Sequence, residues 1–218
     1  MRRAVELALV LLVAGCAHAK PAARGAPVTY LALGDSYTIG EGVAERDRWP
    51  VQLAAMLGIA EPTIIAKTGW TTDELAAAIP ERPGTFSLVT LLIGVNNQYR
   101  GRDLEEYRTQ FTALLARSIE FAGGDPKRVV VLSIPDWGVT PFAKDRDRAR
   151  VAAEIDRFNA VSREESRRAG ARWVDVTDYS RRHPEEVVDD GLHPSPRAYA
   201  AWARAALPEA EAALKDHR

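Results

Sequence analysis

The chain has 218 residues, 46% of them hydrophobic, and its 29 Lys and Arg against 30 Asp and Glu give a formal net charge of −1. This composition is ordinary for a globular domain with its own core and gives no indication of a nucleic-acid partner. The single cysteine excludes an intramolecular disulfide and a cysteine-rich zinc site.

The N-terminal segment has the pattern of a secretory signal peptide. Two arginines precede the mostly apolar run 4–13, which is too short to span a membrane. The stretch 13–16 (V-A-G-C) resembles a bacterial lipobox, which implies cleavage before Cys16 and a lipid on its thiol. Two alternatives stay open: ordinary cleavage after the A-H-A sequence at 17–19, or an uncleaved anchor.

These signals predict three parts of the chain. Residues 1–15 are the expected signal peptide, 16–27 a flexible tether, and 28–218 a single folded domain. We therefore expect a monomer attached to a membrane of the bacterial cell envelope through a lipid on Cys16. The alternative is a secreted or periplasmic protein.

From residue 28 onward, short apolar runs alternate with segments of helical periodicity. In chain order, the sequence predicts a strand at 28–33, a helix at 49–57, a strand at 63–66, a helix at 72–79, a strand at 88–93, a helix at 104–122, a strand at 129–134, a helix at 145–169, a strand at 172–176 and a helix at 196–215. Local signals support the helix ends, such as the capping box of Thr71 and Glu74, while Pro208 predicts a break in the last helix.

This alternation predicts one α/β domain of the three-layer α/β/α type, in which helices cover both faces of a five-stranded parallel sheet. Ligands of such sheets bind at the carboxyl ends of the strands. The residues that follow the strands therefore matter most. They are 34–37 (G-D-S-Y), 67–70 (K-T-G-W), 94–100 (G-V-N-N-Q-Y-R) and 135–138 (P-D-W-G), joined by 189–194 (D-D-G-L-H-P) before the last helix.

The polar residues at this edge suit acyl transfer. A serine hydroxyl such as that of Ser36 needs an adjacent base to act as a nucleophile. His193 is the histidine whose position lets it face the sheet edge, because His18 and His217 lie near the chain ends and His183 lies in a charged loop. Asp190, three residues before His193, could orient the imidazole, with Asp189 as its rival.

Negative charge on a carbonyl oxygen needs fixed hydrogen-bond donors in the transition state. The candidates are the backbone N–H groups of Ser36 and Gly69 and the side-chain amide of Asn96. Taken one by one, each of these residues could equally serve as a turn or helix-cap residue.

In their order and spacing, Gly34-Asp35-Ser36-Tyr37, Gly69, Gly94-x-Asn96 and Asp190-x-x-His193 resemble the four sequence blocks of the SGNH (GDSL) hydrolases. The resemblance implies a flavodoxin-like fold and hydrolysis of carboxylic esters without a metal or another cofactor. It implies that Ser36 is the nucleophile, His193 the base and Asp190 its partner, and that Ser36, Gly69 and Asn96 form the oxyanion hole. The chain lacks the G-x-S-x-G elbow of ordinary α/β-hydrolases.

The sequence gives less information about the substrate. Candidate pocket residues are the aromatics near strand ends and the asparagine where many family members carry aspartate, namely Tyr37, Trp70, Asn97, Tyr99 and Trp137. We expect a small-molecule, glycan or lipid ester. A carbohydrate O-acetylesterase, a lipase or thioesterase, and a non-catalytic envelope lipoprotein that binds glycan or lipid remain alternatives.

Overall fold

The computed structural model describes residues 27–79 and 84–215. Their five strands form one parallel sheet in the order β2-β1-β3-β4-β5. The strands are β1 (Tyr30–Gly34), β2 (Thr63–Ala66), β3 (Leu88–Leu92), β4 (Val129–Leu132) and β5 (Arg172–Val174). The predicted three-layer α/β/α fold is confirmed. Cys16, His18 and His217 lie outside the described residues.

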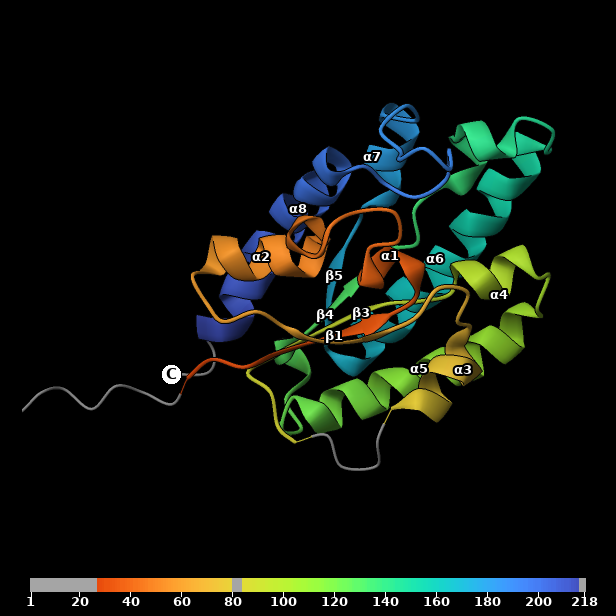
Figure 1. Ribbon diagram of the computed structural model, residues 1–218. Coiled ribbons are helices and arrows are strands. Elements are labelled where there is room, and N and C mark those ends of the chain that lie inside the picture. Colours follow the sequence, from red (N-terminus) through yellow and green to blue (C-terminus); the bar gives the residue numbers. More distant parts are fainter. Residues whose placement is uncertain (1–26, 80–83, 216–218) are drawn as a thin grey trace, which may run out of the picture.

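Helices cover both faces of the sheet (Figure 1). On one face, α2 (Trp49–Leu57) packs against α8 (Pro196–Lys215), and on the other α5 (Leu104–Phe121) packs against α6 (Arg148–Ala169). The smaller α3 (Thr72–Ala78) lies against α5. Within the described ranges, no helix has the length and hydropathy needed to cross a bilayer.

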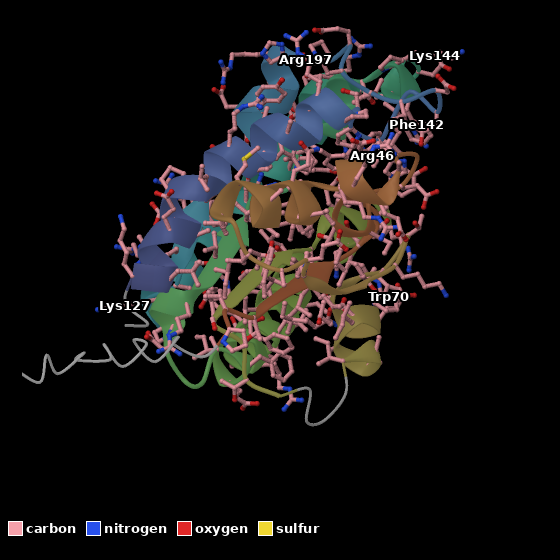
Figure 2. The ribbon with its side chains drawn as sticks, turned by 60° about the vertical axis from the view of Figure 1, so that its left-hand side comes forward. Arg46, Trp70, Lys127, Phe142, Lys144 and Arg197 are labelled. Carbon is pink, nitrogen blue, oxygen red and sulfur yellow. The ribbon has the colours of Figure 1, made fainter. Side chains whose placement is uncertain are left out.

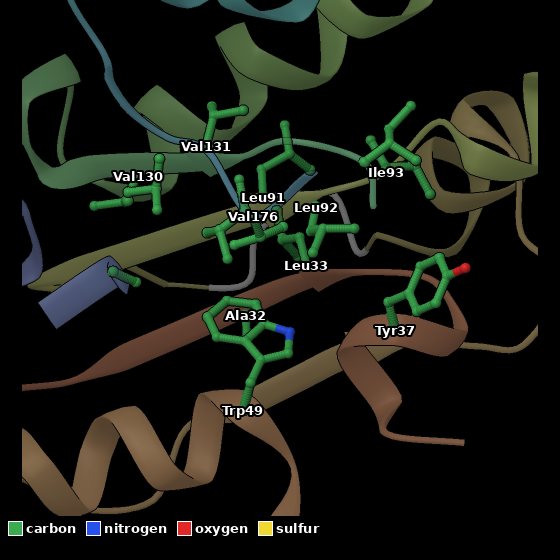
Figure 3. Packing of buried hydrophobic residues seen from close by; sticks show 14 of the residues in the cluster. Ala32, Leu33, Tyr37, Trp49, Leu91, Leu92, Ile93, Val130, Val131 and Val176 are labelled. Carbon is green, nitrogen blue, oxygen red and sulfur yellow. The ribbon is translucent and has the colours of Figure 1, made fainter. Parts of the chain in front are cut away.

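The core lies between these layers. The residues of β1, β3 and β4 are all buried, as expected for central strands of a covered parallel sheet. Figure 3 shows Trp49 of α2 directed at β1 beside Ala32 and Leu33, with the side chains of β3 and β4 beyond. The strand β2 is an edge strand and is only partly buried.

Several predicted ends are confirmed by cap geometry. Gly58 and Gly170 end α2 and α6 in the left-handed conformation, and the capping box of Thr71 and Glu74 opens α3. Asp103 caps α5 by accepting the backbone N–H groups of residues 105 and 106. These motifs act locally, which is why the sequence alone reveals them.

Other boundaries differ from the prediction. The α6 helix begins at Arg148 rather than at 145, because the Asp147 carboxylate caps it by accepting the Arg150 N–H. The β4 strand ends at Leu132, before the predicted 134. There the Ile134 N–H leaves the sheet ladder and donates to the Asn159 side chain.

The predicted break at Pro208 is wrong. The α8 helix continues through the proline to Lys215. Buried alanines on both sides of Pro208 hold the helix against the sheet, among them Ala206 and Ala210. This packing outweighs the loss of one backbone hydrogen bond.

Short helices occupy several of the connections where the sequence suggested turns. They are α1 (Ser36–Ile39), α4 (Val95–Tyr99) and α7 (Thr177–Arg182), together with the 3₁₀ segments η1 (Glu45–Asp47), η2 (Pro126–Arg128), η3 (Trp137–Val139) and η4 (Pro141–Ala143). Several of them carry the candidate site residues, so the site stands on helical turns at the carboxyl edge of the sheet.

Candidate active site

Ser36 is the first residue of α1, directly after β1. Asp35 caps this helix, since its Oδ1 accepts the Tyr37 N–H at 3.0 Å. The turn from strand to helix needs glycine at position 34, where a Cβ would lie 2.2 Å from Thr38 Oγ1. The local sequence therefore fixes Ser36 at a tight turn on the edge of the sheet.

His193 and Asp190 form a close pair on the loop before α8. His193 Nδ1 lies 2.6 Å from Asp190 Oδ2, while Asp190 Oδ1 accepts the backbone N–H groups of Leu192 and His193. The loop is closed by the Val188 N–H, which donates to the His193 carbonyl at 2.8 Å. The aspartate is thus held in place by the same loop that carries the histidine.

The surroundings of Asp190 favour its charged form. Partial burial raises the pKa of this carboxyl, but hydrogen bonds from the His193 ring and from two backbone N–H groups outweigh it and leave the pKa below its ordinary value. At neutral pH the group is therefore a carboxylate that accepts a hydrogen bond from the imidazole.

Ser36 and His193 line one pocket of about 190 Å³. The pocket residues come from the turns after β1, β2, β3 and β4 and from the loop before α8. They are Ser36, Tyr37, Thr68, Gly69, Val95, Asn96, Tyr99, Trp137, Phe142, Leu192 and His193. Within the described residues, the hydrogen bonds of His193 go to Asp190 and Val188, and none joins it to Ser36.

Hydrogen bonds to Trp70 and from Arg100 hold Asn96 and Gly69 at this pocket. The Asn96 amide donates to the Trp70 carbonyl at 3.0 Å, and Arg100 Nη2 donates to the Gly69 carbonyl at 2.6 Å. A side-chain amide has two N–H groups, so the Asn96 nitrogen keeps one donor for another acceptor. The predicted donors Ser36, Gly69 and Asn96 therefore border one cavity.

The position of Asn96 depends on Gly94, which begins the turn into α4. Gly94 has φ of 127°, and a Cβ on it would lie 2.7 Å from the ring of Tyr107. The hydroxyl of Tyr107 donates to the Ile93 carbonyl, which holds that ring in place. The glycine is thus required both for backbone conformation and for space.

Two predicted pocket residues do not line the pocket. Asn97 is fully buried and faces α3, where it accepts the Thr72 N–H at 3.1 Å and donates to the Thr72 hydroxyl at 2.7 Å. Trp70 contributes its carbonyl to Asn96, but its side chain lies outside the pocket. Trp70 was predicted from its place after a strand, and Asn97 because many family members carry aspartate there. Neither signal indicates the direction of a side chain.

The other three predicted pocket residues, Tyr37, Tyr99 and Trp137, line the pocket. Tyr37 packs edge-on against the His193 ring, with 5.7 Å between the ring centroids. Tyr99 and Trp137 form an aromatic group with Phe142 at the pocket mouth. Of these, Tyr99 is 47% and Phe142 43% exposed.

Sequence reasoning missed Thr68, Val95, Phe142 and Leu192. Three of them are direct neighbours of Gly69, Asn96 and His193, so their place beside the motifs was the available signal. Phe142 has no such signal and reaches the pocket through η4, where its N–H donates to the Gly191 carbonyl at 2.9 Å. In Figure 2, Phe142 and Trp70 lie along the same edge of the molecule.

Asp35 is a buried acid beside Ser36. Burial raises the pKa of its carboxyl to about 7, although the Tyr37 N–H partly offsets this. Its Oδ2 atom has no hydrogen-bond partner among the described residues. This environment favours the neutral form of the carboxyl. A neutral carboxyl can cap a helix but is poorly suited to orient a charged imidazole.

Among the described residues, one cluster has the donor atoms of a metal site: His183, Glu185 and Glu186. Glu186 already accepts a hydrogen bond from the Tyr179 hydroxyl and forms an ion pair with Arg197. A cation there would compete with the Arg197 guanidinium, so these residues fit a metal poorly. The cluster is not part of the pocket that Ser36 lines.

Residues 32–201 match the sequence model of the GDSL-like lipase/acylhydrolase family. No curated protein matches the chain at a significant level.

Solved structures with the same fold cover nearly the whole of the described chain. A phospholipase A1 from Streptomyces albidoflavus NA297 is 18% identical, with a TM-score of 0.65 over 85% of this chain and 99% of that chain. A putative GDSL-like lipase from Parabacteroides merdae is 17% identical, with a TM-score of 0.67 over 85% and 96%. A carbohydrate acetylesterase family member from Sinorhizobium meliloti is 19% identical, with a TM-score of 0.62 over 86% and 99%. At these identities, the likeness is one of fold.

Proposed function

The chain belongs to the GDSL-like lipase/acylhydrolase family, and on that premise we propose that it is a serine hydrolase of carboxylic esters with Ser36 as its nucleophile. Ser36 Oγ attacks the carbonyl carbon of the ester, and His193 takes the hydroxyl proton through Nε2. The tetrahedral intermediate collapses as the C–O bond to the alcohol breaks, and His193 returns the proton to the leaving oxygen.

The acyl group then leaves Ser36 by hydrolysis. His193 removes a proton from water, the hydroxide attacks the acyl carbon, and the Ser36 oxygen departs and regains the proton. The reaction consumes one water and releases one carboxylic acid and one alcohol. Asp190 holds the imidazole as the tautomer with hydrogen on Nδ1, which leaves Nε2 free to accept the proton in both steps.

The backbone N–H groups of Ser36 and Gly69 and the free N–H of Asn96 stabilise the oxyanion in this proposal. Three donors from separate turns are held at one pocket before substrate arrives, so little reorganisation is needed in the transition state. The fixed partners of Asn96 and Gly69, described above, support this role.

One observation carries the proposal. The Asp190–His193 pair, at 2.6 Å, lies on a loop that closes over the same pocket as Ser36. Acyl transfer requires a nucleophile and a base with its orienting carboxylate at one cavity. Here the serine and the base come from separate segments of the chain and line the same cavity.

The experiment is an ester panel with Ser36→Ala. Wild type should hydrolyse aryl esters and one or more of acetylated sugars, longer acyl esters and thioesters, whereas Ser36→Ala should lose at least 10³-fold in kcat while keeping its circular dichroism. Ser87→Ala, at the opposite end of β3, should retain activity. Undiminished turnover by pure Ser36→Ala, or no turnover of any ester by wild type, would refute the assignment.

The panel also separates the substrate classes. A preference for acetylated sugars would identify a carbohydrate O-acetylesterase, and a preference for long acyl chains would identify a lipase or thioesterase. A protein that binds glycans or lipids without turnover would be the non-catalytic alternative.

A further inference from the structure

A second and larger hollow adjoins the candidate pocket. This groove has a volume of about 610 Å³ and shares two walls with the pocket, Tyr99 and Trp137. Its other walls are the start of α5, the segment before α6 and the first turns of α6. A substrate with its ester at Ser36 could therefore extend past these two aromatic rings into the groove.

Charged side chains line the groove together with aromatic and aliphatic ones. Four guanidinium groups face it, from Arg102, Arg146, Arg150 and Arg157. Three carboxylates also line it, those of Asp103, Asp147 and Glu154, so the formal charge of its lining is +1.

Each of the three carboxylates is already engaged. Asp103 and Asp147 accept backbone N–H groups as the caps of α5 and α6. Glu154 accepts hydrogen bonds from Arg150 at 2.9 Å and from Gln98 at 2.8 Å.

Two of the four arginines are paired with acids: Arg150 with Glu154, and Arg102 with Glu106 and Asp73. Arg146 and Arg157 form no ion pair among the residues that the structure describes, so they are the groove's unpaired cations.

Arg146 lies against Tyr99, one of the two walls that groove and pocket share. It lies over the Tyr99 ring, 5.9 Å from the centroid, and forms no ion pair within the described residues. Tyr99 is itself a wall of the pocket that contains Ser36. An exposed arginine held against an aromatic ring keeps its N–H donors for an anion.

The shared wall is also rigid. Trp137 Nε1 donates to Gln98 Oε1 at 2.7 Å, and the Gln98 amide donates in turn to Glu154. This relay joins the pocket wall to the ion pair of Glu154 and Arg150 in the groove. The distance between pocket and groove is thus set by buried hydrogen bonds.

We propose that the groove is an anion subsite: it binds a carboxylate or phosphate group on the part of the ester substrate that extends past Tyr99, with Arg146 as its main contact. This inference rests on the proposed ester hydrolysis and specifies its substrate. Arg146 is a specificity-determining residue that acts on binding of the anionic part and does not touch the reacting bond.

The test uses matched sets of esters that differ in charge. An acyl pair compares 4-nitrophenyl butyrate with the 4-nitrophenyl monoester of succinic acid. A leaving-group set compares acetyl esters of 4-hydroxybenzamide, 4-hydroxybenzoate and 4-hydroxyphenyl phosphate. The readout for each enzyme is the ratio of kcat/KM for the anionic ester to kcat/KM for its neutral partner. Comparing this ratio between wild type and variant cancels the intrinsic reactivity of the esters.

Arg146→Gln should lower this ratio about tenfold for at least one anionic ester, as expected for the loss of a hydrogen bond to a charged group. Its kcat/KM for the neutral partner should stay at the wild-type level. Arg146→Lys should restore part of the ratio, and added salt should lower the wild-type ratio. An effect in the acyl pair would mean that the acyl group occupies the groove, and an effect in the leaving-group set would mean that the leaving group does. Within the leaving-group set, the benzoate and phosphate esters show which anion the groove prefers.

Arg167→Gln is the matched control, because Arg167 is an exposed arginine near the opposite end of α6. It should leave every ratio unchanged. Equal ratios in wild type and Arg146→Gln for all anionic esters would overturn the anion subsite, as would an equal loss in the Arg167→Gln control. If neutral esters are still hydrolysed through Ser36 in that case, the proposed function stands without this subsite.

Discussion

At the scale of single residues, the proposed chemistry depends on the pair of Asp190 and His193. Asp190→Asn should lower kcat by about 10³ to 10⁴-fold, because an amide at this position no longer fixes the imidazole tautomer that leaves Nε2 free. Steady-state kinetics on a short aryl ester, with circular dichroism as a check on folding, measure the loss.

Asp189 supplies the matched control for that substitution. It is an exposed carboxylate next to Asp190, and of these two acids it is Asp190 that hydrogen-bonds His193. Asp189→Asn should stay within a few-fold of wild type. A larger loss of kcat in Asp189→Asn than in Asp190→Asn would mean that Asp189, and not Asp190, orients the imidazole.

Asn96 and Asn97 are neighbours with opposite expected effects. Asn96→Ala should lower kcat by about 10² to 10³-fold with little change in stability, since it removes a donor for the developing oxyanion. Asn97→Ala should lower the free energy of unfolding by about 1 to 3 kcal/mol, because it leaves the buried Thr72 N–H without a partner. Kinetics and urea unfolding of both variants check this, and equal kinetic losses would contradict it.

Asp35 links the site to the pH dependence of stability. Its pKa is about 7 in the folded protein and near 4 when unfolded, so the folded state holds the extra proton between these values. The stabilisation of the folded state that comes from this proton uptake is full below pH 4 and is lost as the pH rises through 7. Asp35→Asn keeps an oxygen for the Tyr37 N–H but does not titrate.

Relative to wild type, Asp35→Asn should therefore gain stability as the pH rises from 4.5 to 7.5, by about 2 kcal/mol or more. Urea unfolding at four pH values measures the difference. A difference that stays constant with pH would mean that Asp35 is ionised in the folded protein across this range.

Single residues also show where sequence reasoning reaches its limit. Ser36, Asn96 and His193 line one pocket, and the sequence could suggest their proximity because strands of a parallel sheet end on the same side. Asn97 was misplaced because neighbours on a helical turn point in different directions, and the sequence does not reveal that turn. Phe142 was missed because a tertiary contact with Gly191 brings it to the pocket.

At the scale of elements, α8 contains Pro208 in its interior although proline has a very low helix propensity. It is exposed inside α8, where it removes one backbone donor. Pro208→Ala should raise the free energy of unfolding by about 1 to 3 kcal/mol, because alanine restores that donor and suits a helix interior. Urea unfolding measures it, and a lower stability would show that the proline ring packs favourably.

The long helices could be predicted because their caps and apolar stripes are local features. The short helices α1 and α4 could not, since helices of four or five residues have little intrinsic stability. Their positions follow from glycine turns packed against distant residues, such as Gly94 against Tyr107. These turns carry Ser36 and Asn96, so the site is the part of the fold that local signals describe least well.

At the scale of the whole molecule, the alternation of strands and helices is sufficient to predict the layers, because parallel strands need crossovers and crossovers cover the sheet. It does not give the strand order β2-β1-β3-β4-β5, which depends on which crossovers pass over which face. That order places the turns after β1, β2, β3 and β4 around a single pocket.

The proposed membrane attachment belongs to the whole chain and lies outside the described residues. Cys16→Ser should move the protein from the membrane fraction to the soluble fraction when the full-length gene is expressed in bacteria, since a multiply acylated cysteine anchors firmly. Fractionation with immunodetection, and the intact mass of the wild type, measure it. A wild-type protein that is soluble and begins after Ala19 would contradict the anchor.

The most direct test of the central claim is labelling with a fluorophosphonate, which phosphonylates a serine only when its hydroxyl is activated. Wild type should gain the mass of one phosphonyl group, located on Ser36 by peptide mass spectrometry, and should lose esterase activity in proportion to labelling. Ser36→Ala should gain none, and His193→Ala should react at least 10²-fold more slowly. Labelling at another serine that accompanies the loss of activity, or full activity after complete labelling of Ser36, would contradict the account.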